Sequence, residues 1–188
     1  YICKLSIIIS SKLIKLHWRI FYWTLTGRIK TVIPKISLNH KNKQTRNILI
    51  IFPMDEPSFR VAIYTFRKLG KNDTYKRKFK FIIKEQFKDL FHIQSGDVIL
   101  IQDSDYTDIL KDEKKVLSQL QNIQYDIIID LNSHFHIGIS CLISLLKADL
   151  KVGFRNTFSD KFYNIQLDID KTGIMEKGYK QVNMMLAL

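Results

Sequence analysis

The sequence predicts an α/β protein with an open, mostly parallel sheet that is covered by helices on both faces. From residue 47 onward, short and continuously apolar runs alternate with helical patterns. Such runs are typical of parallel strands buried on both faces. The connections are long enough for crossover helices, which join successive parallel strands. Because 188 residues leave room for only one such domain, the body is expected to be a single domain of this class.

The expected elements alternate along the body. Strands are expected at residues 48–52, 79–83, 98–101, 125–131, 150–153 and 163–168. Helices are expected at residues 57–69, 85–91, 109–122 and 136–146, and from residue 175 to the end. The first of these helices has Pro57 in its first turn and Gly70 just past its end, as helices often do. The runs at 48–52 and 125–131 are expected to be the central strands.

Composition fits a folded protein. Apolar residues make up 46% of the chain and charged residues 26%, which argues against a disordered or collagen-like chain. Cys3 and Cys141 are far apart and lack the spacing of a zinc site or a disulfide framework, so a reducing, cytoplasmic compartment is expected. The chain begins at Tyr1 and ends at Leu188 within a helical pattern, which favours a fragment of a longer protein.

Most of the net charge of +12 comes from one segment. Ten of the 30 basic residues lie within residues 1–54, whereas all 18 acidic residues come later. The remaining chain is therefore nearly neutral. A folded body that binds nucleic acid would carry the excess itself, so no nucleic-acid partner is expected.

The basic leader contains an apolar and aromatic helical pattern at residues 5–25. Lys12, Lys15 and Arg19 interrupt it, and the cost of burying such charges in a bilayer argues against a spanning helix. One stripe of the expected helix consists of Ile9, Leu13, Leu16, Ile20 and Trp23.

Three interpretations of this leader are open. The helix can lie in a membrane interface, with the three bases near anionic lipid and Trp18 and Trp23 at the headgroups. It can instead pack its stripe on the domain, or serve as a nucleic-acid arm. A polar linker follows it, so we expect a leader and linker over 1–46 and a domain over 47–188.

Ligands of open parallel sheets bind beyond the carboxyl ends of the strands. The segments that leave three strands are therefore the candidate site: residues 53–58, 132–136 and 153–159. None of them carries a G-x-G-x-x-G or a P-loop sequence, so tight dinucleotide or P-loop phosphate binding is not expected.

Six segments of the body follow one another in a distinctive order. They are ILII (48–51), FRKL (66–69), YDIIIDLNS (125–133), LLKADLKVGF (145–154), DKFYN (160–164) and KGYKQVNMMLAL (177–188). Their order and spacing resemble the N-terminal half of glycosyltransferase family 9, the bacterial ADP-heptose:lipopolysaccharide heptosyltransferases. The resemblance covers roughly residues 47–188.

The resemblance implies the N-terminal half of a GT-B fold, whose two Rossmann-like domains divide the substrates. The N-terminal domain would hold a lipid-linked sugar acceptor, and the C-terminal domain would hold the nucleotide sugar. It also implies a peripheral location at the cytoplasmic face of the inner membrane and a role in lipopolysaccharide biosynthesis. No cofactor is expected in this chain, since the donor would bind only where a C-terminal domain is present.

The chain departs from the family at the first strand. The family has a Gly-Asp pair there whose Asp is expected to be the general base, and a gapless match places Pro57 and Ser58 at those positions. The donor domain is also missing from these residues, so we expect this chain alone to be inactive. The alternative is a non-catalytic α/β module that docks to a membrane surface or a partner.

Two carboxylates near the first strand are the candidate catalytic residues. Asp55 and Glu56 could replace the missing base, or form the acidic first turn of a helix, which the helix dipole favours.

The candidate acceptor-binding residues are Ser58, Asn132, Ser133, His134 and Arg155. Asn132 or Ser133 could instead cap the helix that follows, and Arg155 could be solvated. His134 and His136 alternate like metal ligands, but no third ligand is near in sequence, so no metal site is expected.

One carboxylate and three aromatic residues near these segments have alternative roles. Asp130, near the end of its strand, is expected to be a hydrogen-bonded structural carboxylate or else part of the site. Phe158, Phe162 and Tyr163 are expected to pack in the core or at its rim rather than to stack on a sugar.

Overall fold

The computed structural model describes residues 2–30, 47–70, 77–102, 110–168 and 175–187, with side chains from Ile14 to Leu186. Its centre is one six-stranded sheet in which every pair of neighbouring strands is parallel. The strands are β1 (Asn47–Ile51), β2 (Lys78–Lys84), β3 (Asp97–Ile101), β4 (Tyr125–Asp130), β5 (Ala148–Phe154) and β6 (Ile165–Leu167). Their order is β3-β2-β1-β4-β5-β6. The expected α/β class with an open parallel sheet is confirmed.

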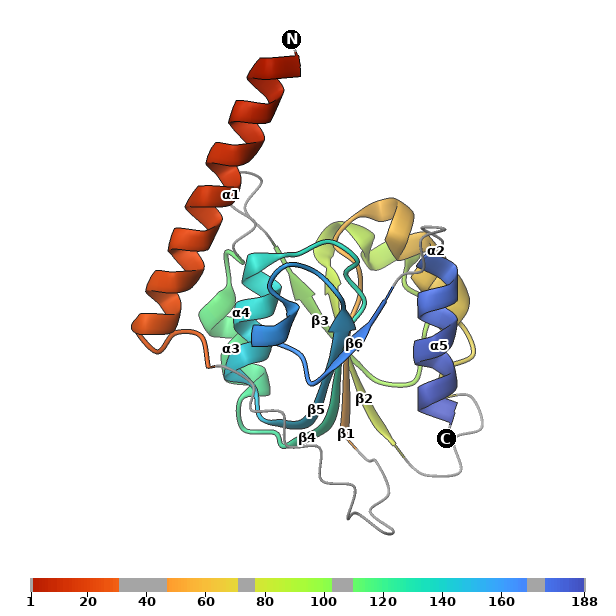
Figure 1. Ribbon diagram of the computed structural model, residues 1–188. Coiled ribbons are helices and arrows are strands. Elements are labelled where there is room, and N and C mark those ends of the chain that lie inside the picture. Colours follow the sequence, from red (N-terminus) through yellow and green to blue (C-terminus); the bar gives the residue numbers. More distant parts are fainter. Residues whose placement is uncertain (1, 31–46, 71–76, 103–109, 169–174, 188) are drawn as a thin grey trace.

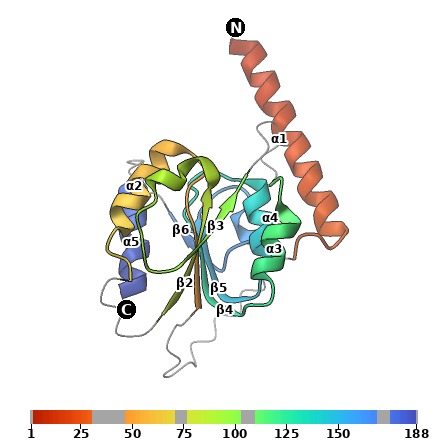
Figure 2. The ribbon, with the colours of Figure 1, turned by 180° about the vertical axis from the view of Figure 1, so that it is seen from behind.

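Helices cover both faces of the sheet (Figure 1, Figure 2). On one face lie α2 (Glu56–Phe66) and α5 (Met175–Ala187), which pack against each other. On the other lie α3 (Glu113–Leu120) and α4 (Ile137–Leu145), with α1 (Ile2–Leu25) outside them. The two layers give two apolar clusters separated by the sheet.

The central position of β1 and β4 is confirmed. Successive residues of β1 point to opposite faces, as in any strand. Leu49 and Ile51 enter the cluster under α3 and α4, whereas Ile48 and Ile50 enter the cluster under α2 and α5. All four side chains are fully buried, which explains the unbroken apolar run in the sequence.

One expected helix has a different form. Residues 85–91 were expected to be helical, and the structure has a 3₁₀ helix, η1 (Glu85–Leu90). Its only buried residue is Phe87, and its first residue has no side-chain cap. A single buried side chain gives no apolar stripe, so a longer α-helix would gain little from packing here.

The stripe predicted for the leader packs on the body where its side chains are described. Ile20 and Trp23 are buried in the cluster under α3 and α4, and Leu16 packs against it. Arg28 lies over the Trp23 ring, 4.3 Å from its centre, and donates a 2.6 Å hydrogen bond to Glu113 of α3. Trp23 therefore does not lie at the surface expected for it. The linker and the boundary at residue 46 fall outside the described residues.

None of the helices in the described ranges is both long enough and apolar enough to cross a membrane.

Candidate functional site

The three segments predicted to form the site follow β1, β4 and β5, and we call them the first exit (53–58), the second exit (132–136) and the third exit (153–159). They lie at one edge of the sheet, because β1, β4 and β5 are consecutive neighbours in the sheet and run in the same direction. A direct contact joins two of them. The backbone N–H of Met54, after β1, donates a 2.9 Å hydrogen bond to Oδ1 of Asn132, after β4. Both residues are buried. This contact fixes the position of the first exit relative to the second.

Asp130 is the anchor of the second exit. Its Oδ1 accepts hydrogen bonds from the backbone N–H and the side-chain amide of Asn132, at 2.9 and 2.7 Å. Its Oδ2 accepts a 2.6 Å hydrogen bond from the hydroxyl of Tyr163. Burial raises the pKa of Asp130, and the hydrogen bonds from Tyr163 and Asn132 oppose that rise. Asp130 is thus the hydrogen-bonded structural carboxylate that was one of its two expected roles.

Tyr163 reaches Asp130 because β5 carries no side chain at Gly153. A Cβ at that position would lie 2.6 Å from the Tyr163 ring. Burial and the neighbouring Asp130 raise the pKa of Tyr163, so its hydroxyl keeps its proton at neutral pH. The glycine is therefore explained by the close approach of an aromatic ring. Tyr163 packs in the core, as expected.

Asp55 and Glu56 make the contacts of a helix start. Asp55 is the N-cap of α2, and its Oδ1 accepts a 2.9 Å hydrogen bond from the N–H of Ser58. Glu56 pairs with Arg60 one turn later, at 2.7 Å. Both carboxylates are exposed at the first exit, so their proposed catalytic role stays a prediction.

Ser58 is only 1% exposed. Its hydroxyl lies 3.4 Å from the sulfur of Met175 in α5. Nearby, the hydroxyl of Tyr179 in α5 donates to the carbonyl of Leu131, at 3.1 Å. The helix α5 thus covers Ser58, and this residue is enclosed by packing rather than open to an acceptor.

The helix α4, which follows the second exit, is capped by a different residue than expected. His136 caps α4, with Nδ1 accepting from the N–H of Ile139 at 3.3 Å. Neither Asn132 nor Ser133 caps this helix, because Asn132 already bonds to Met54 and Asp130. The Ser133 hydroxyl is buried and makes no hydrogen bond within the described part of the chain. His134 is exposed beside it.

The exit of β5 carries an exposed base and an aromatic group. Arg155 lies 3.5 Å from Asp168, and both side chains are about 70% exposed. Phe158 is buried and contacts Phe135 of the second exit, with ring centres 4.8 Å apart. This pair links the second and third exits by apolar contact, so Phe158 packs at the rim, as expected.

Among the side chains that the structure describes, no three His, Cys, Asp or Glu residues gather as metal ligands. Cys141 is buried in α4, where burial raises its pKa to about 12.

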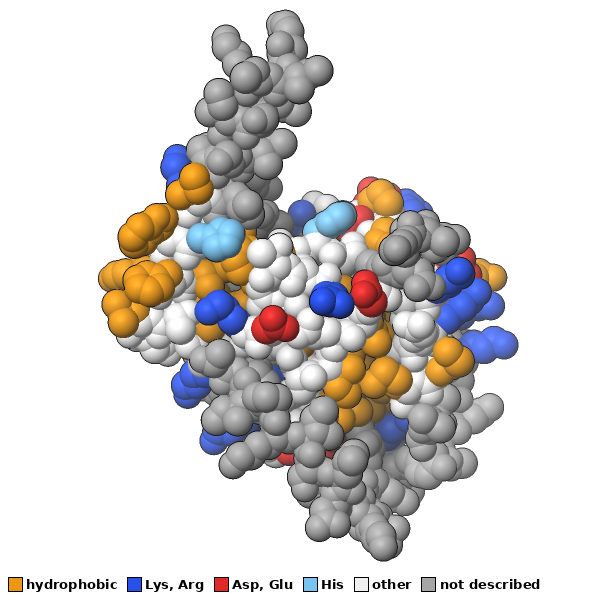
Figure 3. Space-filling model, viewed as in Figure 1, with side chains coloured by type: hydrophobic (Ala, Val, Ile, Leu, Met, Phe, Trp, Pro, Cys, Tyr) orange, Lys and Arg blue, Asp and Glu red, His pale blue; other side chains and the backbone are white. Residues whose placement is uncertain are grey.

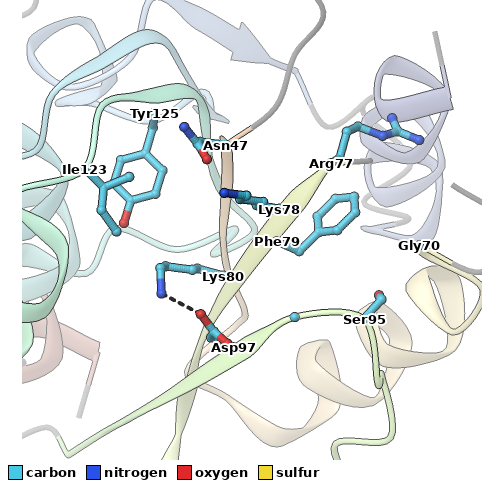
Figure 4. Close-up of a pocket in the computed structure, with 11 residues that line it drawn as sticks. Asn47, Gly70, Arg77, Lys78, Phe79, Lys80, Ser95, Asp97, Ile123 and Tyr125 are labelled. Carbon is cyan, nitrogen blue, oxygen red and sulfur yellow. Dashed lines mark hydrogen bonds and ion pairs between the residues drawn. The ribbon is translucent and has the colours of Figure 1, made fainter. Parts of the chain in front are cut away.

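A separate hollow of about 360 Å³ lies at the opposite edge, where β1, β2, β3 and β4 begin (Figure 4). Lys80 and Asp97 form a 2.7 Å ion pair in its wall, and this pair lowers the pKa of Asp97. The hydroxyl of Tyr125 is buried in the wall without a hydrogen bond from the described residues. The hollow contains none of the predicted site residues, and in sheets of this class ligands bind at the other edge.

Comparisons with known proteins identify the fold. Two solved structures of the E. coli heptosyltransferase WaaC match this chain, one with ADP and one with ADP-2-deoxy-2-fluoro heptose. Both have a TM-score of 0.55, with 18% and 17% sequence identity, and both matches cover 72% of this chain. The fold of this chain is similar to that of part of WaaC.

The matches cover only part of the WaaC chains. This chain covers 45% and 46% of the two WaaC chains, so it spans about half the length of the structures that it matches. The scan against protein-family models and the search of curated proteins gave no match.

Sequence reasoning missed the part that α5 plays at the first exit. Met175 and Tyr179 were placed on a helix, but nothing in the sequence indicated that this helix lies against the ends of β1 and β4. Its helical pattern, with buried Tyr179, Val182 and Leu186 on one side, predicts a packed face but not its partner.

Proposed function

We propose that this chain is the acceptor-side domain of a heptosyltransferase-like glycosyltransferase, and that its carboxyl edge binds a lipid-linked sugar acceptor of the lipopolysaccharide type. The observation that carries the proposal is the meeting of three polar exits at the carboxyl edge of a fold that is similar to WaaC. The corresponding location is peripheral, at the cytoplasmic face of a bacterial inner membrane.

The accessible groups at this edge suit an acidic sugar. The guanidinium of Arg155 is exposed and can hold a phosphate or carboxylate through two parallel hydrogen bonds. The Ser133 hydroxyl lies buried just beneath this surface, without a hydrogen-bond partner among the described residues. His134 beside it is exposed and can bond to a sugar hydroxyl. Asp130 and Asn132 are bonded to each other, to Tyr163 and to Met54, and these contacts hold the ends of β1 and β4 together beneath the exposed groups.

The test is acceptor binding by the whole chain, measured by isothermal titration calorimetry with a deacylated, phosphorylated inner-core oligosaccharide. We expect Arg155→Ala to weaken binding about tenfold, since loss of one charge-assisted contact is worth about 1.4 kcal/mol. The matched control is Lys147→Ala, which removes an exposed base just before the same strand, at the opposite edge.

No binding by the wild-type chain would contradict the proposal, and so would equal weakening by both variants, because the latter indicates non-specific attraction. The second candidate function, a docking module without acceptor specificity, is favoured by the apolar surface of α1. It would be supported by membrane binding together with an absence of oligosaccharide binding.

A further inference from the structure

Five large apolar side chains are exposed on one side of α1, and we name this set the α1 outer face. Its members are Ile14, Trp18, Phe21, Tyr22 and Leu25. Ile14, Trp18, Phe21 and Leu25 follow one another at steps of three or four residues, and Tyr22 is four residues after Trp18, which places all five on a single side of a helix. Figure 3 shows hydrophobic side chains gathered on the side of α1 that points away from the body.

Folding does not account for this surface. The helix is held to the body by Leu16, Ile20 and Trp23, which lie on its other side. Elsewhere in the described residues, only Tyr64, Val98 and Met184 are large, apolar and exposed, and they lie on three different elements. A contiguous apolar surface of this kind indicates a binding partner.

The charge around the α1 outer face indicates the kind of partner. No acidic residue occurs in α1, and Lys15, which follows Ile14 in this helix, is exposed. A second copy of the chain would bring base against base. A partner with negative charge and an apolar interior matches both properties. Trp and Tyr side chains are suited to the region between lipid headgroups and acyl chains.

We infer that the α1 outer face docks onto the surface of an anionic phospholipid membrane, with the helix lying on the bilayer. Trp18, Phe21 and Leu25 enter the interface, and Lys15 contacts lipid phosphates. The docking rests on α1 alone and does not depend on the proposed transferase function.

The helix also stands beside the candidate site. His17 of α1 packs edge-on against Phe158 of the third exit, with ring centres 4.8 Å apart. Docking through the α1 outer face therefore brings the carboxyl edge of the sheet close to the bilayer. This step does rest on the proposed function, since it gives a lipid-linked acceptor a short path to the exits.

The two tryptophans provide a matched test. Trp18 is 68% exposed and Trp23 is 9% exposed. In Trp23→Phe, the remaining Trp18 should shift its emission to shorter wavelength with phosphatidylglycerol-containing vesicles, and brominated lipids should quench it. In Trp18→Phe, the remaining Trp23 should show neither change. Vesicles without any sugar acceptor keep the result independent of the transferase proposal.

Binding strength is tested by co-sedimentation of the whole chain with the same vesicles. The double variant Phe21→Ser/Leu25→Ser should bind about tenfold more weakly than wild type. The control Tyr64→Ser/Met184→Ser, which removes two equally exposed apolar side chains from α2 and α5, should bind as wild type. Binding should also fall with salt and be weaker to phosphatidylcholine alone.

Three outcomes would overturn the inference. One is the absence of vesicle binding by a wild-type chain whose circular dichroism shows it to be folded. Another is equal loss of binding by the two double variants. The third is a concentration-dependent dimer that Phe21→Ser/Leu25→Ser abolishes, which would assign the α1 outer face to a second copy.

Discussion

Individual side chains fix the geometry of the carboxyl edge, and most of their contacts join residues that are distant in sequence. Asp130 bonds to Tyr163, which lies 33 residues later, and Asn132 bonds to Met54, which lies 78 residues earlier. The sequence marked Asp130 and Asn132 because they end an apolar strand. The sequence did not indicate their hydrogen-bond partners, since no local pattern encodes a contact between two strand exits.

Lys151 is a buried base within β5. Its ammonium lies 3.5 Å from the backbone carbonyl of Ser144 in α4. Burial, with a smaller contribution from Lys30, lowers the pKa of Lys151 to about 8 from an ordinary value of 10.5. At neutral pH the folded protein therefore holds a charge in an unfavourable environment.

This burial predicts a pH-dependent stability. Between pH 8 and 10.5 the unfolded chain binds the Lys151 proton and the folded chain does not, so the Lys151 contribution to the free energy of unfolding rises with pH. Lys151→Met should therefore raise the free energy of unfolding at pH 7 by about 1–3 kcal/mol. That advantage should shrink as the pH approaches 10.

Urea unfolding of wild type and Lys151→Met at pH 7, 9 and 10 measures the effect. The exposed Lys147→Met serves as control and should differ little from wild type at each pH. An advantage of Lys151→Met that stays constant with pH would show that the ammonium is not desolvated in the folded protein.

At the scale of elements, apolar runs and helical patterns located most of the fold. Strands β1, β2 and β4 were predicted to within one residue at each end, because a strand buried on both faces has few polar positions. The predicted end of an element was wrong where a contact with a residue distant in sequence sets that end. The strand expected at 163–168 is confined to Ile165–Leu167, since Tyr163 leaves the sheet to reach Asp130.

The candidate site was predicted in outline only. Topology alone placed three exits at one edge, since parallel neighbouring strands end together. The accessibility of each side chain was not predictable, because it depends on what covers the exit. Ser58 and Arg155 were both predicted from the sequence to bind the acceptor. In the structure α5 encloses Ser58, whereas Arg155 is exposed.

The two central strands give a prediction for the core. Ile50 of β1 and Ile128 of β4 are both fully buried and enter different apolar clusters. Ile50→Ala and Ile128→Ala should each lower the free energy of unfolding by about 2–5 kcal/mol, through lost burial and the cavity left behind.

Chemical denaturation measures both variants. The control is Val98→Ala on the edge strand β3, where the side chain is 41% exposed, and the expected loss is below about 1 kcal/mol. Losses below 1 kcal/mol at both Ile50 and Ile128 would be incompatible with two central buried strands.

At the scale of the whole molecule, the chain corresponds to less than half of the WaaC structures that it resembles. We expect the isolated protein to transfer no sugar from ADP-heptose to a lipid A core acceptor. The resemblance to glycosyltransferase family 9 implies that a second domain would hold the nucleotide sugar. At the first exit, Asp55 caps α2 and Glu56 pairs with Arg60.

Release of ADP, measured by chromatography with WaaC as the positive control, decides this point. Turnover by the wild-type chain that disappears in Asp55→Asn would contradict the expectation. It would also identify Asp55 as the base.

The packing of α1 has a consequence for which molecules can reach the exits. Ile20 and Trp23 share one core cluster with Leu49 and Ile128 of the central strands, so α1 cannot turn relative to the sheet without disrupting that core. A flexible tether would let the domain tumble above a bilayer. A helix built into the core instead holds the domain at one height and one tilt. In the membrane docking proposed above, the distance from the bilayer to the exits would then be a fixed length, and an acceptor whose sugar projects less far from the lipid than this length would not be reached.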